Sequence, residues 1–362
     1  MVRRPRRPRT RDRKLKSYQF PDYDEPLEAV DRPDPVPVGT EVLLRIEACG
    51  VCHSDVHLWH GFFDMGGGRK LDVTAVREVP FTLGHEIAGE VIGLGAEAAG
   101  VEIGQRRVVF PWIGCGDCDT CRADLEHLCN RPRALGTHVD GGFADRVVVP
   151  HPRYLFDFGD VPAALACTYA CSGLTAYSAL LKVKDRIADH LVIIGAGGVG
   201  FAGIQIAKHL IDAELIVVEV DDAKLAAVRE AGVVHAVDGR EDDAGRQLRK
   251  LTGGGCAAVI DFVGSEASAT LGLRTVAKSG VLVVVGLFGG TLPVSLPLLA
   301  LKDLTIQGSD LGSLAEMDEL MEMVRAGVIA PLPYERRPLS EAESSLRDLE
   351  AGDVVGRIVL AP

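Results

Sequence analysis

The stretch LVIIGAGGVG, residues 191–200, decides the fold of this 362-residue chain. Its first half is a continuous apolar run, the pattern of a parallel strand that is buried on both faces. Its second half spaces glycines as G-x-G-x-x-G, and residues 201–210 continue in a helical pattern. Between a strand and a helix, such glycines permit a tight turn, close approach of a pyrophosphate and close packing of helix on strand. The stretch therefore predicts a dinucleotide-binding turn.

The next expected strand, residues 215–219, ends in Glu219, nineteen residues beyond Gly200. An acid at this place hydrogen-bonds the adenosine ribose and repels a 2′-phosphate. Asp221 and Asp222 add to that repulsion, and no Arg follows immediately. A glycine-rich turn that binds no nucleotide would not need this acid, so Glu219 favours dinucleotide binding. The repulsion of a 2′-phosphate favours NAD over NADP as the cofactor.

The surrounding chain alternates between helical and strand patterns, which is typical of a doubly wound parallel sheet. Helices are expected over 163–181 and 265–278, and further strands over 257–264, 281–288 and 305–307, the last of six. After Gly308 a helix is expected over 313–326, followed by a terminal strand over 356–360 that returns to the first part of the chain. The length of the chain suggests two domains.

The part before this sheet, from about Ser17 to Arg153, has short apolar runs punctuated by Gly and Pro. This pattern predicts a β-rich domain of short strands and turns. Residues 66–68 are three glycines and predict a flexible loop, and His57 and His60 are expected to lie in one loop as well.

Two short motifs in this part carry metal-binding chemistry. Cys52 is followed by Asp55, and His85 is followed by Glu86. A thiolate and an imidazole suit a borderline-soft divalent metal, most often zinc, and a nearby carboxylate supports such ligands from behind. Two ligands are too few for a site, so another part of the chain must supply a third.

A second metal signal is a run of four cysteines within fifteen residues, Cys115, Cys118, Cys121 and Cys129. Four thiolates close the tetrahedral coordination of a structural zinc ion. An iron–sulfur cluster is the rival, but the last spacing of seven residues and the lack of a following Pro favour zinc. Disulfides between such near neighbours are the least favoured interpretation.

Charge and composition separate the N-terminus from the rest. Residues 1–16 hold nine Arg or Lys and one Asp, whereas the chain as a whole has a net charge of −12. A disordered basic extension over residues 1–14 is favoured over a nucleic-acid-binding arm, because it has no aromatic residue and the body is acidic. No membrane-spanning run or secretory signal is apparent, so a cytoplasmic protein is expected.

Five motifs in order and spacing resemble the zinc-dependent medium-chain alcohol dehydrogenases. They are Cys-His-Ser-Asp at 52–55, Gly-His-Glu at 84–86, the four-cysteine run, Cys-Ser-Gly-Leu-Thr-Ala-Tyr at 171–177 and the glycine-rich turn. The resemblance extends from about Leu15 to Pro362. Residues 110–115, 285–290 and 296–299 most resemble bacterial and archaeal NAD-dependent members, nearest to the 6-hydroxyhexanoate dehydrogenase subgroup.

The resemblance implies a GroES-like catalytic domain over 15–170 and 309–362, with a structural zinc lobe at 112–132, and an NAD-binding Rossmann domain over 171–308. It also implies an oxidoreductase that transfers hydride reversibly between a primary or secondary alcohol and NAD, with two zinc ions per chain. The family implies a homodimer or homotetramer.

The resemblance also implies roles for single residues. Cys52, His85 and Cys171 would bind the catalytic zinc, the four cysteines the structural zinc, and Asp55 and Glu86 would support the ligands. Ser54 would hydrogen-bond the substrate oxygen and His57 would end a proton relay. The residues expected to contact the cofactor are His53, Thr175, Gly195, Gly197, Gly198, Val199, Gly200, Glu219, Val263, Gly286, Phe288 and Arg357.

Three alternatives stay open from the sequence. An ω-hydroxy acid or polyol dehydrogenase could use the same scaffold, but Trp59, Trp112 and Leu287, with Phe288, suggest an apolar substrate pocket. A zinc-binding nucleic-acid protein is disfavoured by the acidic body and the intact dinucleotide turn. Without the resemblance, His57 would more often be a solvated histidine and Cys171 a core thiol.

Overall fold

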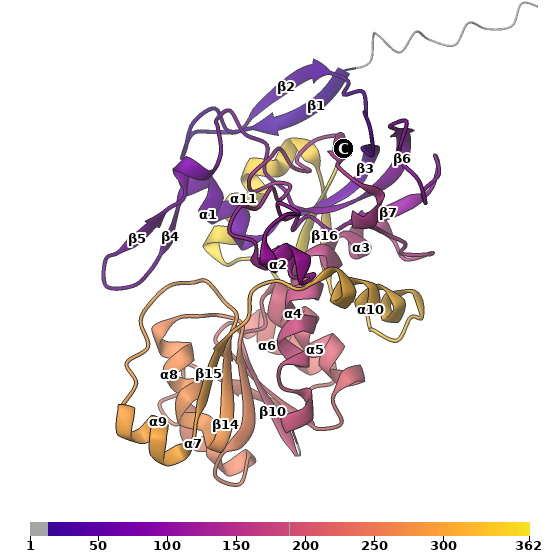
Figure 1. Ribbon diagram of the computed structural model, residues 1–362. Coiled ribbons are helices and arrows are strands. Elements are labelled where there is room, and N and C mark those ends of the chain that lie inside the picture. Colours follow the sequence, from indigo (N-terminus) through magenta and orange to yellow (C-terminus); the bar gives the residue numbers. More distant parts are fainter. Residues whose placement is uncertain (1–13, 188) are drawn as a thin grey trace, which may run out of the picture.

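The structure, a computed structural model, describes residues 14–187 and 189–362 (Figure 1). The predicted basic extension lies outside the described residues, except that Lys14 begins the first strand. Two separate sheets organise the chain: one in the upper half of Figure 1, which also carries the C-terminus, and one in the lower half.

The upper sheet has seven strands in the order β16-β17-β3-β6-β7-β9, with β8 paired to β3. The terminal strand β17 pairs antiparallel with β3, so that Val359 lies opposite Gly50, which confirms that the C-terminus returns to the first part of the chain. The strands are β3 (Val42–Gly50), β6 (Glu86–Leu94), β7 (Arg106–Val109), β8 (Arg146–Val149), β9 (Leu155–Phe156), β16 (Tyr334–Pro338) and β17 (Arg357–Ala361).

Two hairpins and a helix flank this sheet: β1 (Lys14–Gln19) with β2 (Glu28–Pro33), β4 (Phe62–Asp64) with β5 (Lys70–Asp72), and α1 (His53–His60). The expectation that His57 and His60 lie in a loop is therefore wrong. The helix begins after Cys52, whose backbone N–H donates to the carboxylate of Asp55 at 2.9 Å in a capping box. Gly61, with φ of 77°, ends it.

The lower sheet is entirely parallel, in the order β12-β11-β10-β13-β14-β15, which confirms the expected six strands. Its strands are β10 (His190–Ile194), β11 (Glu214–Glu219), β12 (His235–Asp238), β13 (Cys256–Asp261), β14 (Val276–Val284) and β15 (Thr305–Gly308). Its helices are α5 (Gly198–Leu210), α6 (Asp222–Glu230), α7 (Ala244–Leu251), α8 (Glu266–Thr275) and α9 (Leu296–Lys302).

Strand β13 ends three residues earlier than predicted. The carboxylate of Asp261 accepts the backbone N–H groups of Val263 at 2.9 Å and Gly264 at 3.0 Å. This Asx-type turn leaves the strand geometry, and Gly264 has a φ of 69°. The chain therefore turns away at the carboxyl edge of the sheet, where ligands of such folds bind.

The two sheets are joined by helical segments: α3 (Ala163–Ala166), a 3₁₀ turn (Cys167–Ala170), α4 (Ser172–Leu181) and α10 (Leu314–Arg325). A further helix, α11 (Ala342–Ala351), connects β16 to β17 within the seven-stranded sheet. The single helix predicted over 163–181 is wrong, because the chain breaks at Cys171, where φ is −127° and ψ is −74°. The segments on the two sides of the break are bent by 50°.

No single helix in the described residues is long and apolar enough to cross a membrane. The bent pair around Cys171 reaches that length and composition only when its two segments are taken together. Its residues Ala163–Leu180 are buried between the two sheets.

Candidate active site

The metal-ligand cluster begins at the N-terminus of α1. One carboxylate oxygen of Asp55 caps Cys52, and the other accepts the N–H of Gly84 at 3.2 Å and contacts Nδ1 of His85 at 3.1 Å. All three side chains are buried. Because Nδ1 faces a carboxylate, it carries the proton, and Nε2 of His85 is left as the acceptor.

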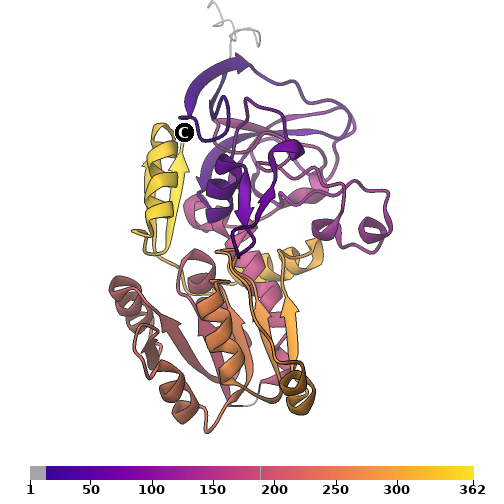
Figure 2. The ribbon, with the colours of Figure 1, turned by 90° about the vertical axis from the view of Figure 1, so that its left-hand side faces the viewer.

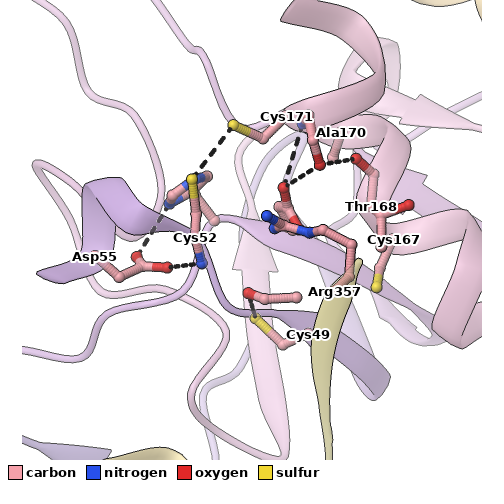
Figure 3. A network of polar contacts seen from close by, with 12 residues as sticks. Cys49, Cys52, Asp55, Cys167, Thr168, Ala170, Cys171 and Arg357 are labelled. Atoms are coloured by element: carbon pink, nitrogen blue, oxygen red, sulfur yellow. Dashed lines mark hydrogen bonds and ion pairs between the residues drawn. The ribbon is translucent and has the colours of Figure 1, made fainter. Parts of the chain in front are cut away.

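Cys171, at the break between the 3₁₀ turn and α4, supplies the third ligand. Its Sγ lies 4.0 Å from Sγ of Cys52, and both side chains are labelled in Figure 3. The ligand atoms of Cys52, His85 and Cys171, together with a carboxylate oxygen of Glu86, lie within 4.8 Å of one another. The structure thus brings together the three residues that the sequence assigned to one site.

The donor set fits a zinc ion. Nε2 of His85 is buried and has no hydrogen-bond partner in the described residues, as expected of an atom that binds a metal. Tetrahedral thiolates at the usual ~2.3 Å from zinc lie about 3.8 Å apart, close to the observed 4.0 Å. The contact with Cys171 and the imidazole of His85 hold the pKa of Cys52 well below its ordinary value, which favours the thiolate that a metal needs.

Glu86 stands behind this cluster rather than at its open side. One oxygen accepts the backbone N–H of Ser172 at 3.2 Å and its hydroxyl at 2.9 Å, and the other pairs with the guanidinium of Arg357. The hydrogen bonds to Ser172 fix the first residue of α4 and so explain the helix break at Cys171. Burial, more than any other factor, raises the pKa of Glu86.

The four-cysteine run forms a second, separate cluster at the short helix α2 (Asp119–Arg122). The Sγ of Cys121 lies 4.0 Å from that of Cys115 and 3.5 Å from that of Cys118, and Cys118 lies 3.8 Å from Cys129. These distances suit four thiolates around one zinc ion and are too long for disulfides, which need about 2.05 Å.

The glycine-rich turn joins β10 to α5. A side chain at Gly200 would strike the backbone of Gly195, whereas one at Gly197 would meet nothing within 4 Å. The turn is therefore closely packed at Gly200 and open at Gly197, where a phosphate would approach the N-terminus of α5. Gly198 and Val199 are the first two residues of that helix.

Glu219 lies beside this turn at the end of β11. Its carboxylate accepts the backbone N–H groups of Ala196 and Val220, both at 2.7 Å, and of Asp221 at 3.1 Å. A cavity of about 600 Å³ opens next to it, lined by Val218, Glu219 and Gly239 among others, and it extends to Val263 and Phe288. The part of the cavity beside Glu219 suits the adenosine half of a dinucleotide.

Arg357 connects the turn to the metal-ligand cluster. The residue is buried, and a Cβ added to Gly198 would lie 2.6 Å from both Cδ and Nη1 of Arg357. Burial is the largest single effect and disfavours the cation, but Glu86, Cys52 and Cys171 together outweigh it and raise the pKa of Arg357. One ion pair therefore spans the distance between the phosphate end of α5 and the metal ligands.

The predicted proton-relay residues lie on the first turns of α1. Ser54 and His57 are three residues apart and share one face of the helix. Burial, with a smaller effect of His53, lowers the pKa of His57 to about 4. Thr175, one turn into α4 from Cys171, has a buried hydroxyl without a partner in the described residues, which leaves it free for a ligand.

Comparisons with known proteins agree with this arrangement. Residues 39–160 match the model of the alcohol dehydrogenase GroES-like domain, and residues 198–326 match that of the zinc-binding dehydrogenases. An NAD-dependent alcohol dehydrogenase of Sulfurisphaera tokodaii is 39% identical over 96% of this chain and 100% of its own. The chain belongs to the zinc-dependent medium-chain alcohol dehydrogenase family.

Two further relatives extend the comparison to this family's archaeal members. An NAD-dependent alcohol dehydrogenase of Saccharolobus solfataricus is 36% identical over 96% of this chain and 100% of its own. The crystal structure of the alcohol dehydrogenase from Aeropyrum pernix superposes with a TM-score of 0.87 at 29% identity, covering 96% and 100% of the two chains. The predicted combination of a GroES-like domain with a Rossmann domain is thereby confirmed. No comparison bears on the 6-hydroxyhexanoate dehydrogenase subgroup.

The two tryptophans of this alcohol dehydrogenase family member have different surroundings. The ring of Trp112 lies 5.1 Å from that of His85, and its Nε1 donates to the carbonyl of Ala170, so Trp112 borders the metal ligands. Trp59 is 1% exposed, donates to Glu25 and lies under the guanidinium of Arg347. Contrary to the prediction, Trp59 packs in the core, because on a helix it faces away from His57, two residues before it.

Leu287 and Phe288 lie on the loop after β14 and are 55% and 66% exposed. The N–H of Phe288 donates to the carbonyl of Val263 at 3.1 Å, which keeps this loop beside the predicted nicotinamide half of the cofactor site. Gly286 makes this close approach possible, since any side chain there would strike the backbone of Val263.

Sequence reasoning named Glu86 and Arg357 separately, but it missed that they form a pair, and it missed Ser172 as part of the site. The partners are 86 and 271 residues apart. A local motif holds no signal for such distant pairs, although a charged residue in the predicted terminal strand, Arg357, would have been a reason to look for a partner.

Proposed function

We propose that this protein oxidises a primary or secondary alcohol with NAD, reversibly, to the aldehyde or ketone. The observation that carries the proposal is the position of Arg357, which links the open end of the dinucleotide turn to a buried cluster of two thiolates and an imidazole. A hydride acceptor and a metal-bound substrate would thus lie next to each other. The relatives named above support the same activity.

In this proposal the chain's residues bind, orient and move one proton. A zinc ion on Cys52, His85 and Cys171 would supply Lewis-acid polarisation of the substrate oxygen, and NAD would accept the hydride. Ser54 accepts the proton of the substrate hydroxyl and passes it to His57. Because its pKa is about 4, His57 is neutral at physiological pH and has a free lone pair for that proton.

Substitution of His57 by glutamine is expected to lower kcat about 10²-fold at pH 7, since Gln cannot take up the proton. Hydroxide would replace the missing base at high pH, so the loss should shrink as pH rises to 9–10. His57 itself stays neutral above about pH 5, so titration of this group should not change the wild-type rate near pH 7.

The matched control is His60→Gln on the same helix, because the ring of His60 contacts Asp24 and Glu350 instead. A pH profile identical to that of the wild type would refute the relay.

The activity itself is tested by following NADH formation with a panel of short, benzylic and cyclic alcohols, ω-hydroxy acids and polyols. We expect turnover of apolar alcohols, because Trp112 and Leu287 offer apolar surface to the substrate. NADP should support a kcat/KM at least ~100-fold lower, since its 2′-phosphate would meet the carboxylate of Glu219. Preference for a polyol or ω-hydroxy acid would select the alternative substrate class, and no turnover with any alcohol would refute the proposal.

We also propose that two copies pair through β15, the edge strand of the six-stranded sheet. Leu296 and Leu301 beside it are 76% and 75% exposed, and an unprotected strand edge readily pairs with another. Sedimentation should give the mass of two or four chains, and Ile306→Lys on β15 should reduce it. Val234→Lys, next to the opposite edge strand β12, is the control. A monomeric wild-type protein would contradict this assembly.

A cytoplasmic location is proposed as well. All nine cysteines are free, and six of them form the two clusters, which need reduced thiolates. A reducing compartment maintains that state.

The proposed domain division, 15–170 with 309–362 and 171–308, is supported by the sheets. All strands of the seven-stranded sheet lie within the first two ranges, and all strands of the six-stranded sheet lie within the third.

A further inference from the structure

The β4–β5 hairpin leaves α1 and reaches toward the six-stranded sheet, as Figure 2 shows. At its tip, Gly66 is buried, whereas the next two glycines are exposed. A Cβ on Gly66 would lie 2.6 Å from the carbonyl oxygen of Gly290, and one on Gly289 would lie 2.8 Å from Cβ of Asp64. The tip therefore rests directly on the loop that follows β14.

Both partners of this contact are well defined. The carboxylate of Asp64 accepts the N–H of Gly66 at 2.7 Å, and the N–H of Met65 donates to Arg69 at 2.9 Å, which closes the hairpin tip. On the other side, the N–H of Gly289 donates to Gly264 at 3.1 Å. The hairpin thus spans from the metal-bearing half of the molecule to the wall of the nicotinamide site.

The base of the same hairpin covers His57. The ring of Phe63 lies 4.8 Å from the imidazole of His57, and the ring of His53 lies 5.2 Å from it. Phe62, the residue before it, points elsewhere: its ring lies 3.4 Å from Nζ of Lys70. The charged or titratable groups around His57 are His53, His60 and Cys52 on or beside α1, and Glu350 on α11.

We propose that the β4–β5 hairpin positions the proton-relay histidine: Phe63 packs on the imidazole of His57 and excludes water from it while the tip is seated on Gly289 and Gly290. Phe63 is a positioning residue, since it acts through His57. The inference rests on the proposed relay role of His57. An apolar ring that replaces water disfavours the imidazolium and keeps His57 as a neutral acceptor.

The first test measures the titration of His57 directly, by NMR of the full-length zinc-loaded protein with ¹³C-labelled histidine, with His57→Gln to assign the signal. Phe63→Ala should move the midpoint of His57 upward, toward the ordinary histidine value of about 6.5. Phe62→Ala, the neighbour that faces Lys70, should leave it in place, and Phe63→Tyr should restore the wild-type midpoint. An unchanged or lowered midpoint in Phe63→Ala would overturn the proposal.

The second test displaces the tip without touching Phe63. Gly66 and Gly68 have φ of 73° and 75°, so alanine causes the same backbone strain at both, but only at Gly66 would it strike Gly290. Gly66→Ala should therefore raise the His57 midpoint, and Gly68→Ala should not. Equal His57 midpoints in the two variants would show that the contact between the hairpin tip and Gly290 does not hold Phe63 in place.

The pH profile of kcat separates this inference from the proposed function. In Phe63→Ala, kcat should fall as the pH drops from 7 to 5, because a less shielded His57 becomes protonated in this range. Its kcat at pH 5.5 should be several-fold lower than at pH 8. The NMR midpoints do not depend on turnover. A shifted midpoint with no alcohol oxidation by any variant would therefore refute the enzyme activity and leave the packing role of Phe63 standing.

Discussion

Replacing Cys171 with alanine is expected to remove one of two zinc ions per chain and to lower kcat/KM for alcohol oxidation by ~10³-fold or more. The loss follows because Cys52 and His85 alone are two ligands, and Lewis-acid polarisation of the substrate is worth several kcal/mol. The metal content is measured by elemental analysis of the purified protein, and the rate by NADH absorbance. The four-cysteine cluster shares no residue with this site and should keep its ion.

Cys167→Ala is the matched control for this experiment. Cys167 lies four residues earlier in the same helical segment, is fully buried and donates only to the carbonyl of Ala164 at 3.5 Å. It should retain both zinc ions and nearly the wild-type rate, with at most a modest loss of stability. If Cys171→Ala also kept two zinc ions, Cys171 would not be a ligand, and the three-residue site would be wrong.

The sequence predicted the parallel sheet well because its signals are local. A run of apolar residues, a fixed spacing of glycines and an acid at the end of the next strand lie within thirty residues, from Leu191 to Glu219. The chemistry of the metal ligands was equally readable, since cysteine and histidine at such spacing have few other uses. The third ligand, however, was identified only through the resemblance of residues 171–177 to a family.

What the sequence could not predict depends on long-range contacts. Residues 163–181 form a continuous helical pattern, yet Glu86 binds Ser172 and breaks the helix at the point where Cys171 must face the metal. The assignment of Trp59 to the substrate pocket failed for a related reason. Once residues 53–60 form a helix, Trp59 and His57 face opposite sides, and the local sequence did not reveal that helix.

Arg357→Met is expected to destabilise the zinc-loaded protein by ~3–5 kcal/mol, because it leaves the carboxylate of Glu86 buried without its cation. Both side chains are buried, at 3% and 0% exposure. Thermal unfolding should show a Tm lower by about 10 °C. Arg45→Met, which breaks the exposed pair with Glu90 across β3 and β6, should cost less than ~1 kcal/mol and serves as the control.

The double variant Glu86→Gln with Arg357→Met decides whether this loss is electrostatic. Removing both charges should recover most of the stability, since a buried ion pair contributes little net energy beyond avoiding an unpaired charge. Dinucleotide binding would still be weakened, because Arg357 also lies against Gly198 at the phosphate end of α5. If the double variant were no more stable than Arg357→Met, the side chain would act by packing alone. The ion pair would then not be what fixes the position of the dinucleotide turn relative to the metal ligands.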